Sequence, residues 1–406
     1  MLRSSLIAFL MLVFVPGYAQ YKNDNVLFKT VFPQDLCKEL KKNKGYLFLD
    51  VRSQGEYYDT SASTGLNIGH LDGAINIDIR QLPQQWRQIE AYKDKPVFVY
   101  CSHSQRSRRA SKLLADSGFT NVMNINGGMT ALHMLTGDEK YCVDEYFKTA
   151  NKYSLISSAA FCQRLVAKGT TYILDVRPDS AWNRVTGNAK TNAFGYFSGT
   201  KHIALSELEN KLSEIPKTQP IVVTDLNGTD AAKAAKLLVD KGYTNVKALI
   251  EGIDRWLYAD RSDWPCAELY VSPAKFNIMS SGEFSRFFPA NKDAVILDVR
   301  SAEEFAGTHK DGFRNIGHLK NAINIPANDI PTRISELDKH KSVPVVIYSF
   351  SSGAEMYAVA DALAKNGFSK VYVLAGGLFN VRWTASNTPG MKFMHDWVEG
   401  VSEENK

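Results

Sequence analysis

Short apolar runs recur along the chain, and each ends abruptly at polar residues. One set of three runs ends in the same tripeptide, Asp-Val-Arg, which begins at Asp50, Asp175 and Asp298. The runs of a second set, each followed by a polar loop and then by apolar residues at helical spacing, lie at 97–100, 221–224 and 345–348. Such runs are typical of strands buried on both faces, and their alternation with helical stretches is typical of a parallel sheet covered by helices. The pattern therefore predicts an α/β fold.

The spacing of these features indicates three copies of one unit. Asp50 and Asp175 are 125 residues apart, and Asp175 and Asp298 are 123 residues apart. A period of this length is typical of tandem domains and too long for a solenoid of small repeats. We predict domains at 20–145, 146–262 and 263–392, each a parallel sheet with helices on both faces, and a solvated tail at 393–406.

The first 19 residues have the pattern of a secretory signal peptide. Arg3 precedes an apolar run at 6–15, and the small residues Gly17 and Ala19 follow it. The run is short for a membrane span, and no cysteine follows it as in a lipoprotein. We therefore predict cleavage before Gln20 and an exported protein, periplasmic or secreted, with no membrane span once the signal is removed.

Composition narrows the function classes. The chain of 406 residues is 44% hydrophobic and 22% charged, as in ordinary globular proteins. A net charge of +5 is small for this length and gives no support to nucleic-acid binding. No cysteines and histidines have the spacing of a zinc site, so we expect neither a metal nor a cofactor.

The first unit carries a candidate nucleophile at the end of its second apolar run. Cys101 directly follows this run, and a helical pattern continues from Arg108. At such a junction, backbone N–H groups and the helix dipole stabilise a thiolate and can bind an anion. We predict that Cys101 is catalytic, with a buried structural cysteine as the alternative. The predicted anion-binding residues are Ser102, His103, Ser104, Gln105, Arg106 and Ser107.

These motifs resemble those of the rhodanese family, and the resemblance covers essentially the whole chain after the signal sequence as three domains. The first domain carries Asp50-Val51-Arg52, the segment 69–74, Cys101 with Arg106 five positions later, and Gly127-Gly128. The resemblance implies a sulfurtransferase, in which the cysteine takes sulfane sulfur from a donor as a persulfide and passes it to a thiophilic acceptor. The implied donor is a small anion such as thiosulfate, and the acceptor is a thiol, cyanide or a protein. Ser104 departs from the family, where glycine is common.

Two other functions compete with this prediction. Phosphatases and arsenate reductases with a similar loop have one more residue between cysteine and arginine, whereas four separate Cys101 from Arg106 here. The shorter loop favours a smaller sulfur substrate, and no second cysteine lies beside Cys101 for redox chemistry. The main alternative is a persulfide carrier or binding protein with little turnover on free thiosulfate.

The second and third units lack both the cysteine and the arginine. Alignment without gaps places Asp225 at the position of Cys101 and Asp230 at the position of Arg106. The third unit offers Ser349 or Phe350, depending on where one extra loop residue is placed. We therefore predict that both units are inactive in sulfur transfer. Because Asp-Val-Arg recurs in units without a nucleophile, we predict a scaffolding role for it.

The four remaining cysteines form two equivalent pairs. Cys37 and Cys162 each lie 13 residues before the aspartate of Asp-Val-Arg, and Cys142 and Cys266 each lie 14 residues after a glycine turn. The third unit lacks both members together. Since an exported compartment permits disulfides, we predict the bridges Cys37–Cys142 and Cys162–Cys266, with buried small apolar residues as the alternative. Cys101 would then be the one free thiol.

Overall fold

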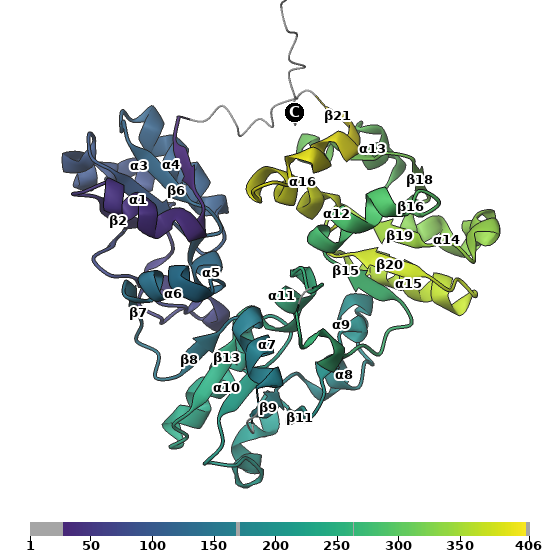
Figure 1. Ribbon diagram of the computed structural model, residues 1–406, viewed down its shortest axis with the longest axis horizontal. Helices are drawn as coiled ribbons and strands as arrows, with labels where there is room; N and C mark the ends of the chain where they lie inside the picture. Colours follow the sequence, from purple (N-terminus) through teal and green to yellow (C-terminus); the bar gives the residue numbers. More distant parts are fainter. Residues whose placement is uncertain (1–26, 168–170, 263, 403–406) are drawn as a thin grey trace, which may run out of the picture.

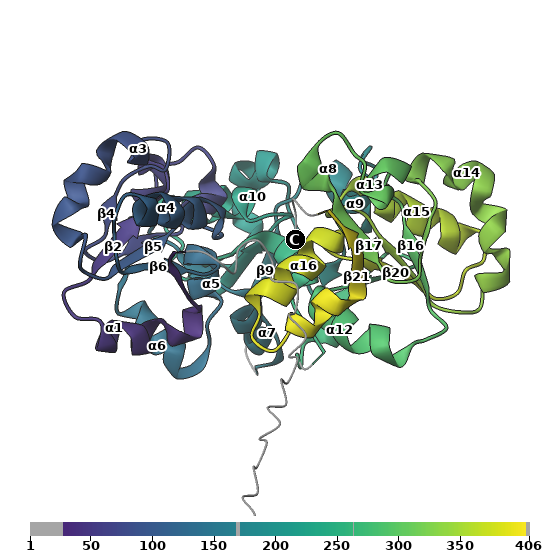
Figure 2. The same ribbon diagram turned by 90° about the horizontal axis from the view of Figure 1, so that it is seen from above.

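The computed structural model describes residues 27–167, 171–262 and 264–402, which form three domains of the same α/β architecture. In Figure 1 the first domain lies on the left, the second below and the third on the right. Figure 2 shows the first and third domains at opposite ends of the molecule. The predicted signal peptide lies outside the described residues. Within them, no helix has the length and apolar character needed to cross a membrane.

The first domain is built on a five-stranded parallel sheet of order β1-β6-β5-β2-β4. Its strands are β1 (Lys29–Val31), β2 (Leu47–Asp50), β4 (Ile75–Asn76), β5 (Val97–Tyr100) and β6 (Val122–Ile125). Its helices are α1 (Leu36–Lys42), α2 (Gln54–Tyr57), α3 (Leu82–Gln85), α4 (Gln105–Asp116), α5 (Gly128–His133) and α6 (Gly137–Asp144).

Successive strand residues point to opposite sides of this sheet, and helices cover both sides, so both faces are buried. Leu49 and Val99 pack with Leu114 of α4 in one cluster. Phe48 and Phe98 pack against residues of α1 and α5 in another. The uninterrupted apolar runs of the sequence therefore reflect strands that have helices on both sides.

The second domain repeats this sheet with the order β11-β9-β12-β13-β8. Its strands are β8 (Ser154–Ile156), β9 (Tyr172–Asp175), β11 (Lys201–His202), β12 (Ile221–Thr224) and β13 (Val246–Leu249). Its helices are α7 (Ser158–Val166), α8 (Asp179–Trp182), α9 (Ala189–Ala193), α10 (Thr229–Asp240) and α11 (Gly252–Tyr258).

The third domain has the sheet order β15-β20-β19-β16-β18. Its strands are β15 (Asn277–Met279), β16 (Val295–Asp298), β18 (Ala322–Asn324), β19 (Val345–Tyr348) and β20 (Val371–Leu374). Its helices are α12 (Ser281–Ala290), α13 (Ala302–Ala306), α14 (Ile330–Arg333), α15 (Ala354–Lys365) and α16 (Gly377–Asn387).

A small antiparallel sheet closes each domain. The pairs are β3 (His70–Leu71) with β7 (Phe147–Lys148), β10 (Tyr196–Phe197) with β14 (Tyr270–Val271), and β17 (Ile316–Leu319) with β21 (Val398–Val401). The strands β7 and β14 lie just beyond the domain boundaries predicted after residues 145 and 262.

The pairing of β21 corrects the prediction of a solvated tail at 393–406. Met394 is fully buried, and Trp397 packs against Phe284 of α12 with 5.8 Å between ring centroids. The polar turn at 387–390 and the acidic end of the chain suggested a solvated extension, but the apolar residues between them continue the core through residue 401.

The Asp-Val-Arg tripeptides are structural in every domain. The Arg52 guanidinium donates to both carboxylate oxygens of Asp50 and, over 2.6 Å, to the carbonyl of Gly69. All of these groups are buried, so each charge is neutralised by its partner. The second and third domains repeat the arrangement with Arg177, Asp175 and Gly195 and with Arg300, Asp298 and Gly317.

The structure contains the two disulfides Cys37–Cys142 and Cys162–Cys266. Their Cα atoms are 6.5 Å and 5.3 Å apart, respectively. The first ties α1 to α6, and the second ties α7 to the segment that precedes β14. Cys101 is the one free cysteine of the described residues, and it is buried.

Candidate active site at Cys101

Cys101 lies at the carboxyl end of β5, the central strand of the first sheet. Only 1% of the residue is exposed. Its carbonyl accepts a hydrogen bond of 2.8 Å from the N–H of Met129, which fixes the strand end against α5. Gly128 makes this approach possible, because it has φ of +56° and a Cβ there would lie 2.1 Å from the Cys101 carbonyl oxygen.

Residues 101–107, the Cys101 loop, surround the thiol with polar groups. The N–H of Ser104 donates to Sγ over 3.2 Å, and the thiol donates to Oγ of Ser107 over 3.6 Å. Ser107 lies in the first turn of α4, so the positive end of that helix faces the sulfur. A backbone N–H and the positive end of a helix dipole therefore both face Sγ, which is the arrangement of an anion-binding loop.

Ser104 takes a backbone conformation that usually requires glycine. Its φ is +87°, and it immediately precedes α4. Its hydroxyl donates to Oδ1 of Asn126 over 3.2 Å and accepts from the N–H of Gly127. These hydrogen bonds stabilise the strained backbone of Ser104. Its N–H therefore stays directed at the sulfur although the residue is serine and not the expected glycine.

Arg106 does not point freely into the site, because its guanidinium is bound by Glu56. Two nitrogens each donate over 2.6 Å to the two oxygens of that buried carboxylate. Burial raises the pKa of Glu56, but the hydrogen bonds and charge of Arg106 outweigh this and leave the pKa below its usual value. Arg106 also donates to Oγ of Ser102 over 2.8 Å, so it holds the loop in place.

His103 and Gln105 point away from the sulfur. Gln105 is exposed, and the His103 side chain is 47% exposed at the boundary with the second domain. Nδ1 of His103 lies 2.9 Å from Oγ of Ser102, and Nε2 contacts the carboxylate of Glu251 in the second domain. Of the predicted loop residues, Ser102, Ser104 and Ser107 are thus buried around the thiol. Arg106 and His103 instead contact Glu56 and Glu251.

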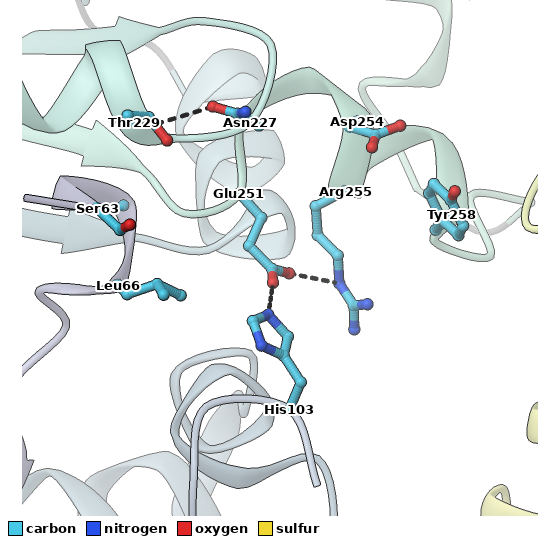
Figure 3. Close-up of a pocket in the computed structure, with 10 residues that line it drawn as sticks. Ser63, Leu66, His103, Asn227, Thr229, Glu251, Asp254, Arg255 and Tyr258 are labelled. Carbon is cyan, nitrogen blue, oxygen red and sulfur yellow. Dashed lines mark hydrogen bonds and ion pairs between the residues drawn. The ribbon is translucent and has the colours of Figure 1, made fainter. Parts of the chain in front are cut away.

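A cavity of about 310 Å³ lies beside this loop between the first and second domains. Figure 3 shows His103 directed at Glu251 and Glu251 directed at Arg255. Ser63 and Leu66 lie on the side of Glu251 away from Arg255. The sequence patterns predict neither the place of Glu251 beside the loop nor the pairing of Arg106 with Glu56. Each pairing depends on residues far apart along the chain, for which spacing within one motif carries no signal.

The second domain holds a carboxylate where the first holds its thiol. Asp225 is buried, and its oxygens accept hydrogen bonds from the N–H groups of Gly228 at 2.6 Å and Asp230 at 2.8 Å. Burial raises the pKa of Asp225 to about 6, although these N–H groups oppose the rise. Gly228 occupies the place of Ser104, so the same loop backbone directs an N–H at a thiol in the first domain and at a carboxylate in the second.

The third domain also places a carboxylate at its loop. Ser349 follows β19, and its hydroxyl donates to Oε1 of Glu355 over 2.5 Å. Neither of these loops presents a thiol or an arginine.

Comparison with known proteins identifies the same repeats. The family model described as "Rhodanese-like domain" matches residues 33–134, 158–259 and 282–383. The chain is 33% identical over 117 residues to the uncharacterized protein YibN of Escherichia coli, which covers 29% of this chain and 73% of that protein. It is 33% identical over 110 residues to the uncharacterized protein YqhL of Bacillus subtilis, covering 27% and 76%. A crystal structure of a rhodanese-related protein from Thermoplasma volcanium matches with 30% identity, 26% and 89% coverage and a TM-score of 0.21.

Proposed function

Because this chain belongs to the rhodanese family, we propose that it is a sulfurtransferase whose chemistry resides in the first domain alone. Cys101 takes sulfane sulfur from a small anion of the thiosulfate class and passes it to a thiol, cyanide or a protein acceptor. One observation carries this proposal. The Cys101 thiol is the free thiol of the described residues, and it sits in a loop whose Ser104 N–H is directed at its sulfur.

The proposed reaction has two displacement steps at sulfur. In the first, the Cys101 thiolate attacks the sulfane sulfur of thiosulfate, a new S–S bond forms, and sulfite leaves with the electron pair of the broken bond. In the second, the acceptor attacks the outer sulfur of the persulfide, and the Cys101 thiolate leaves. Negative charge is on the cysteine or its outer sulfur between steps, where loop N–H groups and the α4 terminus stabilise it.

The second domain supports this role for the loop backbone. There the equivalent N–H groups bind the Asp225 carboxylate, an anion supplied by the chain itself. In the first domain a thiol occupies the same place, and the N–H groups can stabilise a charge that forms and disappears during turnover.

A persulfide carrier is the second candidate, and the burial of the thiol favours it. With Cys101 only 1% exposed and the loop facing the second domain, access for a free donor is narrow. A carrier of this kind would form the persulfide but turn over slowly with free thiosulfate.

Mass spectrometry of the full chain after incubation with thiosulfate tests the proposal. We expect a gain of one sulfur atom on Cys101, lost when cyanide or a thiol is added, and no gain in Cys101→Ser. Absence of the added sulfur in the native chain would overturn the proposal. Steady-state rates of thiocyanate formation then distinguish an enzyme, with sustained turnover, from a carrier, with a single fast transfer.

We further propose that the protein acts after export, in the periplasm or outside the cell. The two disulfides support this location, because such bonds persist in oxidising compartments. Fractionation of producing cells, with detection of the chain and its mass, tests the location and the predicted cleavage before Gln20.

A further inference from the structure

A glutamate occupies a glycine position at the start of α11. In the first and third domains the residue before the equivalent helix is Gly127 or Gly376, with φ of +75° or +80°. The second domain has Glu251 there, with φ of +56°. A side chain in this left-handed region is strained, and such residues persist when other contacts hold them in place.

The contacts that hold Glu251 belong largely to the first domain. One carboxylate oxygen contacts Nε2 of His103, and the other lies 3.5 Å from Nε of Arg255. Thr130 of α5 also lowers the pKa of this carboxylate, and its Oγ1 lies 3.4 Å from Nε2 of His103. Burial raises the pKa of Glu251, but His103 and Arg255 together bring it below its usual value, so the group is ionised at neutral pH. Figure 3 shows the carboxylate between these two side chains.

From Glu251, hydrogen bonds continue to the residue next to the nucleophile. Nδ1 of His103 lies 2.9 Å from Oγ of Ser102, which in turn accepts a hydrogen bond of 2.8 Å from Arg106. A neutral imidazole that donates through Nε2 to Glu251 has Nδ1 as an acceptor for the Ser102 hydroxyl. The position of the Glu251 carboxylate therefore orients the His103 ring and the Ser102 hydroxyl.

We propose that the second domain, which lacks a nucleophile, completes the active site of the first, with Glu251 as the positioning residue. Glu251 holds His103, and through it Ser102, so that the Cys101 loop keeps the arrangement that stabilises negative charge at the sulfur. The expected effect on sulfur transfer rests on the proposed function. The effect on the reactivity of the thiol does not.

The variant Glu251→Gly tests the proposal with the residue that the other two domains already carry. We expect the maximal rate of Cys101 persulfide formation at saturating thiosulfate to fall about tenfold, roughly the value of one charge-assisted hydrogen bond at a half-exposed site. The half-saturating thiosulfate concentration should change less than the rate, because the Ser104 N–H that faces the sulfur does not hydrogen-bond Glu251. The melting temperature should be unchanged or higher, since glycine relieves the strained backbone.

Two further variants separate the carboxylate from the backbone. Glu251→Gln retains the side-chain volume and should slow persulfide formation like Glu251→Gly. Glu209→Gln, an exposed glutamate of the same domain paired with Lys241, should change nothing. In a His103→Gln background, Glu251→Gly should have little additional effect, because the same hydrogen-bonded chain is already broken.

Alkylation of Cys101 by iodoacetamide gives a readout that is independent of sulfur transfer. In the full chain, both Glu251 variants should change the alkylation rate severalfold, whereas Glu209→Gln should not. Equal alkylation rates and equal persulfide rates in all variants would overturn the role of Glu251. Altered alkylation in a chain that forms no persulfide would overturn the proposed function and retain the positioning role.

Discussion

The loops after β5 and β12 have the same backbone conformation but differ in the side chain at their centre. In the first domain the Ser104 N–H donates to the sulfur of Cys101, and in the second the equivalent Gly228 N–H donates to Asp225. The third domain directs Glu355 at Ser349 instead. The affinity of this loop for negative charge is therefore a property of the fold. In the second domain a resident carboxylate accepts these hydrogen bonds, whereas in the first domain the loop N–H faces a thiol.

The largest expected effect on this comparison comes from removal of the nucleophile. Cys101→Ser should lower sulfur transfer by more than about 10³-fold, because neither other loop offers a thiol. Thiocyanate formation from thiosulfate and cyanide measures the loss. Substantial residual activity in this variant would show that the second or third domain transfers sulfur, and would end the distinction between the loops.

Matched glycine substitutions separate the fold of the loops from their chemistry. Gly128→Ala and Gly252→Ala each place a Cβ within 2.1 to 2.6 Å of backbone atoms of the adjacent loop, at positive φ. Each should destabilise the chain by about 4 kcal/mol, as large backbone clashes do. Urea denaturation measures this loss.

Gly128→Ala should also strongly reduce the specific activity of the protein that remains folded, because it displaces the Cys101 carbonyl. Gly252→Ala, next to Glu251, should reduce it by no more than the roughly tenfold loss expected for the Glu251 variants. An equal loss of specific activity in Gly252→Ala would mean that the second loop takes part in the reaction directly.

Loss of the Arg106–Glu56 pair should have a smaller effect. Arg106→Ala leaves the buried Glu56 carboxylate without its partner, which should cost about 3 kcal/mol and reduce activity by roughly 10- to 100-fold through movement of Ser102. Because the folded pKa of Glu56 is below its usual value, this stabilisation is present above about pH 4 and is lost as the pH falls through the folded pKa.

Denaturation of the native chain and Arg106→Ala at several pH values measures this dependence. The two should converge in strong acid and differ at neutral pH. Arg80→Ala, which removes an exposed pair with Asp78 in the same domain, is the control and should behave like the native chain.

The smallest expected effect concerns the carboxylate of the second loop. Burial raises the pKa of Asp225 to about 6, above its value in an unfolded chain, so the folded domain binds the proton more tightly. Stability of the second domain should therefore fall as the pH rises from about 4 to about 6, by at most ~3 kcal/mol. Amide hydrogen exchange in β12 should report this fall, and Asp225→Asn should flatten it. Exchange in β5 should show no such step.

Much of this architecture is predictable because local patterns determine it. The apolar runs mark the strands, the repeats give the three-domain arrangement, and the joint presence of cysteine pairs indicates the two disulfides. The place of Cys101 at a strand end follows from the same pattern. Each of these features depends on residues close in sequence or on comparison of one repeat with another.

The contacts that position the site are not predictable in this way. Arg106 in α4, after β5, meets Glu56 in α2, after the neighbouring strand β2, and His103 meets Glu251 across a domain boundary. Both depend on how distant elements pack. The polar turn at 387–390 predicts an end of the core, whereas Met394 beyond it is fully buried because apolar residues follow the turn.

The disulfide of the first domain places a demand on how the chain folds. Cys37 and Cys142 are separated by 105 residues, whereas Cys101 and Cys142 are only 41 residues apart. In an unfolded chain the shorter loop closes at a lower entropic cost, so an oxidant acting early favours the incorrect bridge. Burial of Cys101 at the end of β5 removes this competitor. Oxidative folding in which the sheet forms before the bridge therefore keeps Cys101 as a free thiol.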